Sequence, residues 1–196
     1  MRFRLGLTGS IGMGKSQTAG FFAEAGCPVW DADAAVHRLY GAGGAAVAAI
    51  GAAFPQAIVD GAVSREALRE VIASDSTALK RLESIVHPHV RADRAEFDRT
   101  HPEAIGVFDI PLLYETGSET EFDAVACVTI PEDIQRERVL ARGTMSAEDL
   151  DRILARQMPN AEKCARADFV ITTDTLDHAR AQVQAVLKEI ERRIDA

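Results

Sequence analysis

The chain has 196 residues, enough for one domain with elaborations around its core. Its hydrophobic content of 47% and charged content of 27% are ordinary for a globular protein, and no apolar run is long enough to predict contact with a membrane. The net charge of −8 argues against a nucleic-acid-binding surface. Three widely spaced cysteines indicate reduced thiols rather than a disulfide framework. The N-terminus lacks the pattern of a signal peptide, which predicts a cytoplasmic protein.

The first predicted elements are a short apolar strand at residues 3–8 and a helix at residues 15–25. The loop between them fits G-x-x-x-x-G-K-[ST], the P-loop, and reads Gly9-Ser10-Ile11-Gly12-Met13-Gly14-Lys15-Ser16. Its glycines let backbone N–H groups turn toward phosphate oxygens, while Lys15 reaches the β- and γ-phosphates and Ser16 offers its hydroxyl to Mg²⁺. A plain glycine-rich turn is the alternative, but the order of strand, loop and helix favours phosphate binding.

Four further apolar runs predict strands at residues 28–30, 104–108, 124–130 and 169–172. They are nearly continuous rather than alternating, which is typical of strands buried on both faces of a parallel sheet. Helical periodicity lies between and after them, for example from Leu176 to Ile194, and Ser146 with Asp149 predicts a capping box. The pattern therefore predicts an α/β fold with a doubly wound, five-stranded parallel sheet.

Two segments interrupt this alternation within what we interpret as a single domain of residues 1–196. About 70 residues separate the second and third predicted strands, far more than a crossover needs, and their helical stripes predict an inserted helical lobe at residues 35–103. A smaller helical segment, rich in arginine, occupies residues 132–165, and we expect it to act as a lid.

Candidate site residues follow the predicted strands, where open parallel sheets bind ligands. Asp31 and Asp33 follow the second strand, and Asp33 is a candidate general base for an attacking hydroxyl, although either residue could instead cap the next helix. Asp109 ends the third strand as a Walker B-type aspartate does, so we expect it to hold Mg²⁺ through water, together with Ser16; capping a helix is its alternative role.

Arginines after the fourth strand could neutralise a transferring phosphoryl group, although such runs are usually a solvated surface. We interpret Arg142 as functional and Arg138 as a second candidate. Arg152 and Arg156 could equally be structural.

Taken together, these segments resemble the dephospho-CoA kinase family over nearly the whole chain. The P-loop with the preceding strand is similar to the family's opening, and Asp31-Ala32-Asp33 matches its Asp-Ala-Asp. The most specific match is Asp109-Ile110-Pro111-Leu112-Leu113-Tyr114-Glu115. Further matching segments are Ser64-Arg65, His87-Pro88, Arg152-Ile153 with Gln157, and Ala167-Asp168-Phe169-Val170-Ile171.

The resemblance implies a P-loop NTPase fold of the nucleoside-monophosphate-kinase type. It implies that ATP, with Mg²⁺, phosphorylates the ribose 3′-hydroxyl of dephospho-CoA to give CoA and ADP, the last step of CoA synthesis. Asp33 would then be the base and the inserted lobe, with Arg65 and His87, would help to hold the acceptor. Glu115 would support that site or be structural. The ATP-binding residues would be Gly9, Gly12, Met13, Gly14, Lys15, Ser16, Gln17 and Arg142.

Two departures from the family pattern stand out. Ser10 and Met13 occupy positions where glycine and serine are frequent, but neither is a spacing glycine, so we expect the phosphate grip to survive. After the last strand the family often has a turn with Asn and Gly near the adenine, whereas this chain has Thr172-Thr173-Asp174-Thr175. The sequence therefore does not indicate which residues contact the adenine.

Two other functions remain open from the sequence. One is a P-loop kinase for another small acceptor, such as a nucleoside monophosphate. The other is a nucleotide-binding module without catalysis. A GTPase is disfavoured, because the chain lacks Asn-Lys-x-Asp and has Ile110-Pro111 after Asp109.

Overall fold

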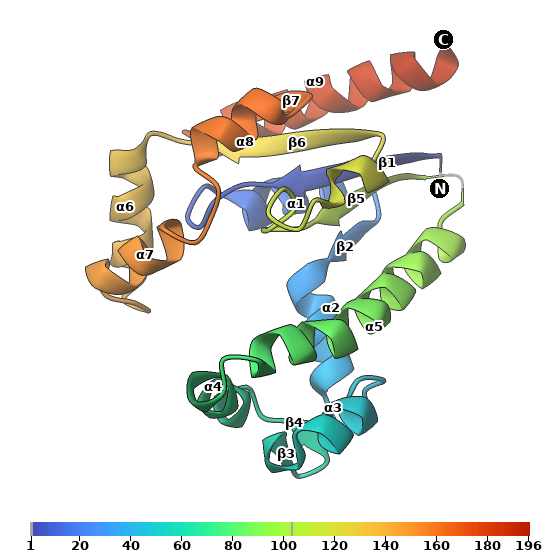
Figure 1. Ribbon diagram of the computed structural model, residues 1–196. Coiled ribbons are helices and arrows are strands. Elements are labelled where there is room, and N and C mark those ends of the chain that lie inside the picture. Colours follow the sequence, from blue (N-terminus) through green and yellow to red (C-terminus); the bar gives the residue numbers. More distant parts are fainter. Residues whose placement is uncertain (1, 103) are drawn as a thin grey trace. The chain divides into compact units, whose positions relative to one another are not determined.

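The computed structural model describes residues 2–102 and 104–196, which divide into two units. The first unit contains the residues up to Trp30 and those from His101 onward, and the second contains Asp31–Thr100 (Figure 1). None of the helices formed by the described residues is both long enough and apolar enough to cross a membrane.

A five-stranded sheet forms the centre of the first unit, and its strands follow the order β2-β5-β1-β6-β7. β1 pairs in parallel with β5 and β6, and β6 pairs in parallel with β7. The strands are β1 (Phe3–Thr8), β2 (Val29–Asp31), β5 (Ile105–Asp109), β6 (Ala124–Thr129) and β7 (Phe169–Thr172). All five strands were predicted from the continuous apolar runs, and the prediction of a parallel five-stranded sheet is confirmed.

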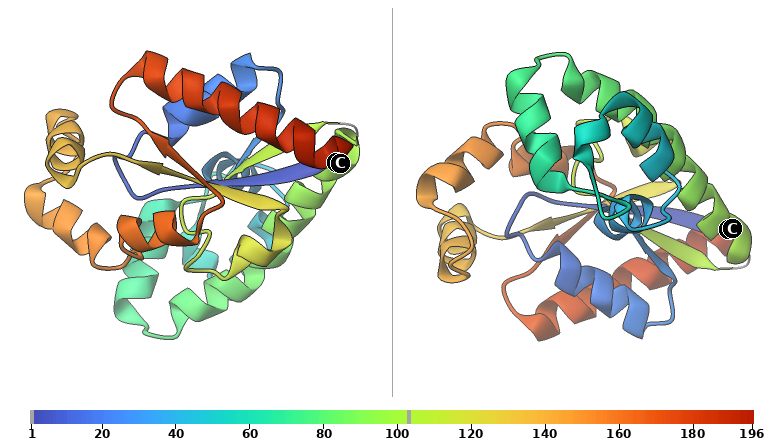
Figure 2. Two further views of the ribbon diagram at one scale, coloured as in Figure 1. Left: turned by 90° about the horizontal axis from the view of Figure 1, so that it is seen from above. Right: turned by 90° about the horizontal axis from the view of Figure 1, so that it is seen from below.

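Helices cover both faces of this sheet, so the fold is doubly wound as predicted. Figure 2 shows α1 (Lys15–Glu24) and α9 (Leu176–Asp195) on one face, and α8 (Asn160–Arg166) on the other, beside the segment that contains the short 3₁₀ helix η2 (Ser118–Glu121). Helices can lie on both faces because the strands are apolar on both sides.

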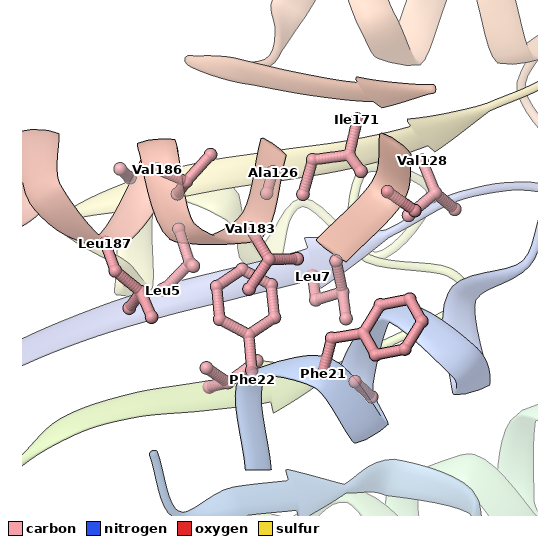
Figure 3. Packing of buried hydrophobic residues seen from close by; sticks show 14 of the residues in the cluster. Leu5, Leu7, Phe21, Phe22, Ala126, Val128, Ile171, Val183, Val186 and Leu187 are labelled. Atoms are coloured by element: carbon pink, nitrogen blue, oxygen red, sulfur yellow. The ribbon is translucent and has the colours of Figure 1, made fainter. Parts of the chain in front are cut away.

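The main core lies between the sheet and the pair α1 and α9 (Figure 3). Phe22 of α1 and Val183 of α9 are fully buried against Leu5 and Leu7 of β1. α9 presents apolar residues at helical spacing to the strands, which is why a helix pattern could be read from Leu176 onward. This packing anchors the strand and the helix on either side of the glycine-rich loop.

Two further helices, α6 (Glu132–Ala141) and α7 (Ala147–Leu154), lie beyond the carboxyl ends of the strands (Figure 1). The capping box predicted at the start of α7 is present. The Asp149 amide donates to Ser146 Oγ at 3.1 Å, and the Ser146 amide donates to Asp149 Oδ2 at 3.2 Å. The two hydrogen bonds fix the start of α7 after the turn that follows Arg142.

The second unit is mostly helical and has its own apolar core. Buried side chains of Leu39, Ile50, Phe54, Leu68 and Leu82 pack together there. Its elements are α2 (Ala32–Tyr40), α3 (Val47–Ala53), the 3₁₀ helix η1 (Pro55–Ala57), β3 (Ile58–Val59), β4 (Ala62–Val63), α4 (Arg65–Ser74) and α5 (Ala78–Thr100). The inserted lobe predicted at residues 35–103 overlaps this unit, and its function as an acceptor-binding lobe stays a prediction.

The small hairpin β3–β4 was not predicted. Its turn is Asp60-Gly61, and both residues have positive φ, 50° for Asp60 and 76° for Gly61. An Asp-Gly pair at a two-residue turn is a strong hairpin signal, so the sequence did contain the information. The strands are only two residues each, too short for an alternating pattern to be visible.

Candidate active site

The glycine-rich loop connects the carboxyl end of β1 to the start of α1. Gly12 and Gly14 have φ of 80° and 89°, a left-handed conformation that favours glycine. A Cβ atom on Gly12 would overlap the Val139 side chain, and one on Gly14 would lie 2.9 Å from Thr173 Oγ1. The loop therefore requires glycine at both positions for conformation and for space.

Several main-chain donors of the loop have no partner within the part of the chain that the structure describes. α1 begins at Lys15 without a side-chain cap, so N–H groups at its start have no internal acceptor to donate to. The positive end of the helix dipole lies at the same place. The donors without an acceptor are the N–H groups of Gly12, Gly14, Lys15, Ser16 and Gln17. Such a group of open donors is an anion-binding arrangement.

The other main-chain groups of the loop are bound by side chains from distant segments. The Ser10 amide donates to Asn160 Oδ1 at 3.0 Å, and the Ile11 amide donates to Gln157 Oε1 at 3.3 Å. Gln135 Nε2 donates to the Ile11 carbonyl at 2.6 Å. These contacts satisfy main-chain groups of Ser10 and Ile11, so this part of the loop is fixed while the remaining donors stay open.

Met13 and Thr173 complete this support. The Met13 side chain is buried in the main core, its amide donates to the Ser10 carbonyl at 3.2 Å, and its carbonyl accepts from Thr173 Oγ1 at 2.7 Å. The threonine turn that replaces the family's Asn- and Gly-containing turn therefore supports the loop from outside. Arg138, the second arginine candidate, donates to the Thr173 carbonyl at 2.9 Å and so fixes the same turn.

Lys15 forms an ion pair with Asp109, whose carboxylate is 2% exposed. Asp109 is the last residue of β5, and the parallel register places it beside Leu7 of β1. The structure thus brings together two residues that the sequence placed at separate strand ends. Ser16 follows Lys15 in the first turn of α1 with an exposed side chain.

The two aspartates after β2 have different surroundings. Asp31 is the N-cap of α2, and its Oδ1 accepts from the Ala34 amide at 2.8 Å. Asp33 lies in the first turn of α2 with an exposed side chain, and its carboxylate has no hydrogen-bond partner among residues 2–102 and 104–196. The capping function is therefore taken by Asp31, and the Asp33 carboxylate is left available.

Glu115 lies in an ion pair that the sequence did not indicate. The Lys163 side chain is fully buried and its Nζ lies 2.8 Å from Glu115 Oε1. The Met158 amide donates to the same oxygen at 2.9 Å. Burial by itself would raise the pKa of Glu115, but these two hydrogen bonds outweigh it and lower the pKa. Glu115 is thus held as a carboxylate.

Lys163 also fixes the segment that follows Asp109. Its Nζ donates to the Pro111 carbonyl at 3.0 Å, and the Thr8 hydroxyl donates to the same oxygen at 3.2 Å. A lysine is rarely fully buried, and nothing in the pattern around residue 163 distinguishes it from a surface lysine. Lys163 was therefore missed in the sequence analysis. Asn160 and Gln135 were also missed, because their sequence surroundings give no sign of their contacts with the loop.

The remaining arginines fall into two groups. Arg136 forms an ion pair with Asp151, and Arg152 forms one with Asp149. Arg142, at the end of α6, and Arg156 are both exposed, and neither side chain has a partner in the described part of the chain. The Arg142 guanidinium is therefore available to bind a ligand, as its predicted contact with a phosphoryl group requires.

The two acceptor-site candidates of the second unit are both on its surface. Arg65 is the first residue of α4, directly after the N-cap Ser64, and its side chain is exposed. His87 lies within α5, before Pro88, and is exposed as well. Their roles in acceptor binding stay predictions.

Comparisons with known proteins agree with this geometry. The model of a family described as dephospho-CoA kinase matches residues 3–178. The chain is 64% identical over 190 residues to a dephospho-CoA kinase from Ruegeria pomeroyi, covering 97% of this chain and 96% of that protein. It is 59% identical over 194 residues to one from Cereibacter sphaeroides, covering 99% and 98%.

Solved structures share the fold. The crystal structure of TT1252 from Thermus thermophilus has a TM-score of 0.83 and 36% identity, covering 95% of this chain and 97% of that one. A dephospho-CoA kinase from Campylobacter jejuni has a TM-score of 0.72 at 24% identity, covering 96% and 97%, which supports the fold alone.

Proposed function

This chain belongs to the dephospho-CoA kinase family, and from that premise we propose that it transfers the γ-phosphoryl group of ATP to the ribose 3′-hydroxyl of dephospho-CoA. The products are CoA and ADP. One observation supports ATP binding in this proposal. Side chains bind the Ser10 and Ile11 amides of the glycine-rich loop, while the loop's remaining N–H groups are open beside Lys15. We expect the reaction to take place in the cytoplasm, where ATP and Mg²⁺ are both available.

We assign nucleotide binding to the loop and to two cationic side chains, Lys15 and Arg142. The open N–H groups bind phosphate oxygens, and Lys15 leaves Asp109 to contact the β- and γ-phosphates. Arg142 stabilises the charge on the phosphoryl group during transfer, since its guanidinium has no protein partner to release. Residues 132–165, which include it, would act as a lid.

We assign the proton transfer to Asp33. Its carboxylate accepts the proton of the ribose 3′-hydroxyl while the oxygen attacks the γ-phosphorus, and the bond to the bridging oxygen of ADP breaks. Support comes from its surroundings, because the carboxylate is exposed and is not used as the helix cap, which is Asp31. An available acceptor is what a base requires.

Ser16 and Asp109 fit a magnesium ion, because hydroxyl and carboxylate oxygens are its preferred protein ligands. Within residues 2–102 and 104–196 no three His, Cys, Asp or Glu side chains gather into a metal site. Ser16 would offer its hydroxyl to the ion, and Asp109 would hold it through water. When bound, Mg²⁺ neutralises negative charge on the phosphates.

Acceptor binding is assigned to the second unit and to the segment after Asp109. Arg65 and His87 are exposed and can contact the anionic and aromatic parts of dephospho-CoA. Glu115 supports this site, and Lys163, which contacts both Glu115 and the Pro111 carbonyl, holds residues 111–115 in place. The inserted lobe of residues 35–103 is thus the acceptor-binding part of the enzyme.

Release of ADP, coupled to an optical readout, tests this function. ATP and Mg²⁺ are supplied with dephospho-CoA, with AMP, or with a dephospho-CoA analogue that lacks the ribose 3′-hydroxyl. We expect turnover with dephospho-CoA alone, and a Lys15→Ala variant gives the background. Full activity on AMP with none on dephospho-CoA would reject the proposed acceptor. Release of no ADP with any acceptor, from protein that binds ATP, would identify a binding module instead.

A further inference from the structure

Two free cysteines lie in contact beside the glycine-rich loop. Cys127 belongs to β6 and is fully buried, whereas Cys164 belongs to α8 and is partly exposed. Their sulfur atoms are 3.4 Å apart. The register of the sheet places Cys127 beside Thr8, the last residue before the loop. The pair therefore lies directly next to the phosphate-binding segment.

Asn160 connects this thiol pair to the loop. It lies one helical turn before Cys164 on the same face of α8. Its Nδ2 lies 3.6 Å from Cys164 Sγ and 3.2 Å from both the Val128 carbonyl and Thr129 Oγ1 of β6. Its Oδ1 accepts from the Ser10 amide at 3.0 Å and lies 3.9 Å from Cys127 Sγ. The same amide side chain thus contacts both sulfurs and one main-chain group of the loop.

We propose that Cys127 and Cys164 are a reversible redox modification site, and that their oxidation to a disulfide by a low-molecular-weight disulfide weakens ATP binding through Asn160. The consequence for ATP rests on the proposed function of the loop. The formation of the disulfide itself does not depend on it.

The reaction proceeds in two exchange steps. The Cys164 thiolate, which is the accessible one, attacks one sulfur of the small disulfide, whose S–S bond breaks and releases one thiol. The Cys127 thiolate then attacks Cys164 Sγ in the mixed disulfide and expels the second thiol. In total the protein loses two protons and two electrons, and the small disulfide is reduced to two thiols.

Burial makes the second step the slower one. It raises the pKa of Cys127, and a negative charge on Cys164 raises it further, while the nearby Lys163 ammonium opposes this. When Cys164 is in the mixed disulfide it carries no charge, so it no longer raises the pKa of Cys127 through its charge. Sustained exposure to oxidant is therefore needed to close the pair.

In the proposal, disulfide formation draws α8 toward β6. The sulfur atoms move from 3.4 Å to a bond length of about 2.05 Å, so they approach by about 1.4 Å. Asn160 is on the helix that moves, and it exchanges a thiol contact for a disulfide. Its hydrogen bond to the Ser10 amide is the link through which the loop is displaced.

The full-length protein, incubated with glutathione disulfide, tests the inference. Thiols counted after denaturation should fall from three to one, with a mass lower by two hydrogen atoms. ATP affinity, measured by direct binding without acceptor, should fall about tenfold, as expected for loss of one hydrogen bond to a buried amide, and a reducing agent should restore it.

Two variants serve as controls. Cys164→Ser should keep the ATP affinity of its own reduced form after the same incubation. Cys27→Ser should still respond, because Cys27 precedes β2 and so lies at the amino edge of the sheet, away from the loop.

Three outcomes contradict the proposal. In the first, all three thiols remain free after prolonged incubation. In the second, a glutathione adduct persists on Cys164 while Cys127 stays a thiol. In the third, the disulfide forms but ATP affinity is unchanged. Failure of the reduced protein to bind ATP would instead reject the proposed function of the loop, whatever the thiol count.

Discussion

The two units of the molecule differ in where they keep their polar groups. In the first unit, buried polar side chains lie at or near the glycine-rich loop, among them Thr8, Asp109 and Thr173, and Lys163 is buried beneath the segment after Asp109. In the second unit, the packed core is apolar, Arg94 is the buried charged residue that the structure describes, and the residues predicted to act on the acceptor are exposed. The proposed nucleotide site is thus held in advance by hydrogen bonds within the protein, whereas the proposed acceptor contacts rely on surface side chains.

This difference leads to a separation of effects. Substitutions around the loop should change ATP binding and the stability of the first unit. Substitutions on the surface of the second unit should change acceptor use and leave ATP affinity intact. Asp33 is the exception to this separation. It belongs to the second unit, but we propose that it acts as the general base, so its replacement should affect turnover rather than acceptor binding alone.

Replacement of Asp33 should have the largest effect. Asp33→Asn removes the proton acceptor, and we expect kcat to fall about 10²- to 10⁴-fold with ATP affinity unchanged. Asp31→Asn is the matched control, since asparagine is also a good N-cap and turnover should persist. Steady-state kinetics combined with ATP binding measures both quantities. Unchanged turnover in Asp33→Asn would remove it as the base.

Removal of the buried lysine should destabilise the first unit. Lys163→Met leaves the Glu115 carboxylate without its buried partner, and we expect a loss of about 3–5 kcal/mol in the free energy of unfolding. The double variant with Glu115→Gln should recover part of this loss. Urea denaturation measures it, and Lys188→Met on the exposed side of α9 is the control. A loss below about 1 kcal/mol would show that the pair does not hold the segment.

The same pair predicts a pH dependence. The pKa of Glu115 is lowered in the folded protein, so its contribution to stability is fully present above the ordinary glutamate pKa. It is lost as the pH falls through the lowered value. Urea midpoints measured between neutral and acidic pH should therefore fall less steeply for Glu115→Gln than for the unmodified chain. Parallel curves would contradict the assignment.

Replacement of Lys15 should mainly reduce transition-state stabilisation. For Lys15→Ala we expect kcat/KM for ATP to fall about 10²- to 10³-fold, because a preorganised cation at the phosphates is removed. Asp109 also loses its ion-pair partner, so unfolding is measured alongside kinetics. Lys188→Ala, an exposed lysine of the same unit, should have no effect. Near-normal kinetics in folded Lys15→Ala would mean that the loop does not bind the triphosphate as proposed.

The sequence was most informative where a pattern is local. Continuous apolar runs predicted all five strands of the sheet, and the spacing of three glycines with Lys15 predicted the loop. The Ser146 and Asp149 spacing predicted a capping box for the same reason. These features depend on neighbouring residues alone, so a single chain displays them.

The supports of the loop could not be predicted in the same way. Asn160 and Gln157 bind amides about 150 residues away in the chain, and Lys163 reaches the Pro111 carbonyl 52 residues away. A polar residue on a helix carries no local sign that its partner is a distant main-chain group. Only the folded topology, which brings α8 beside β6, makes these contacts visible.

Substitution of two arginines from the same segment allows a direct comparison, and we expect its effect on activity to be the smallest of those proposed here. Arg142 and Arg156 are both exposed and without a partner in the described part of the chain, yet only Arg142 is assigned to ATP. Arg142→Ala should lower kcat/KM for ATP about 10- to 100-fold, the value of a charge-assisted hydrogen bond, and Arg156→Ala should leave it unchanged. Rescue of Arg142→Ala by added guanidinium would separate a charge contact from a folding defect. Equal kinetics for both variants would place Arg142 with the solvated surface, and the charge of the transferring group would then be balanced by the loop and Lys15 alone.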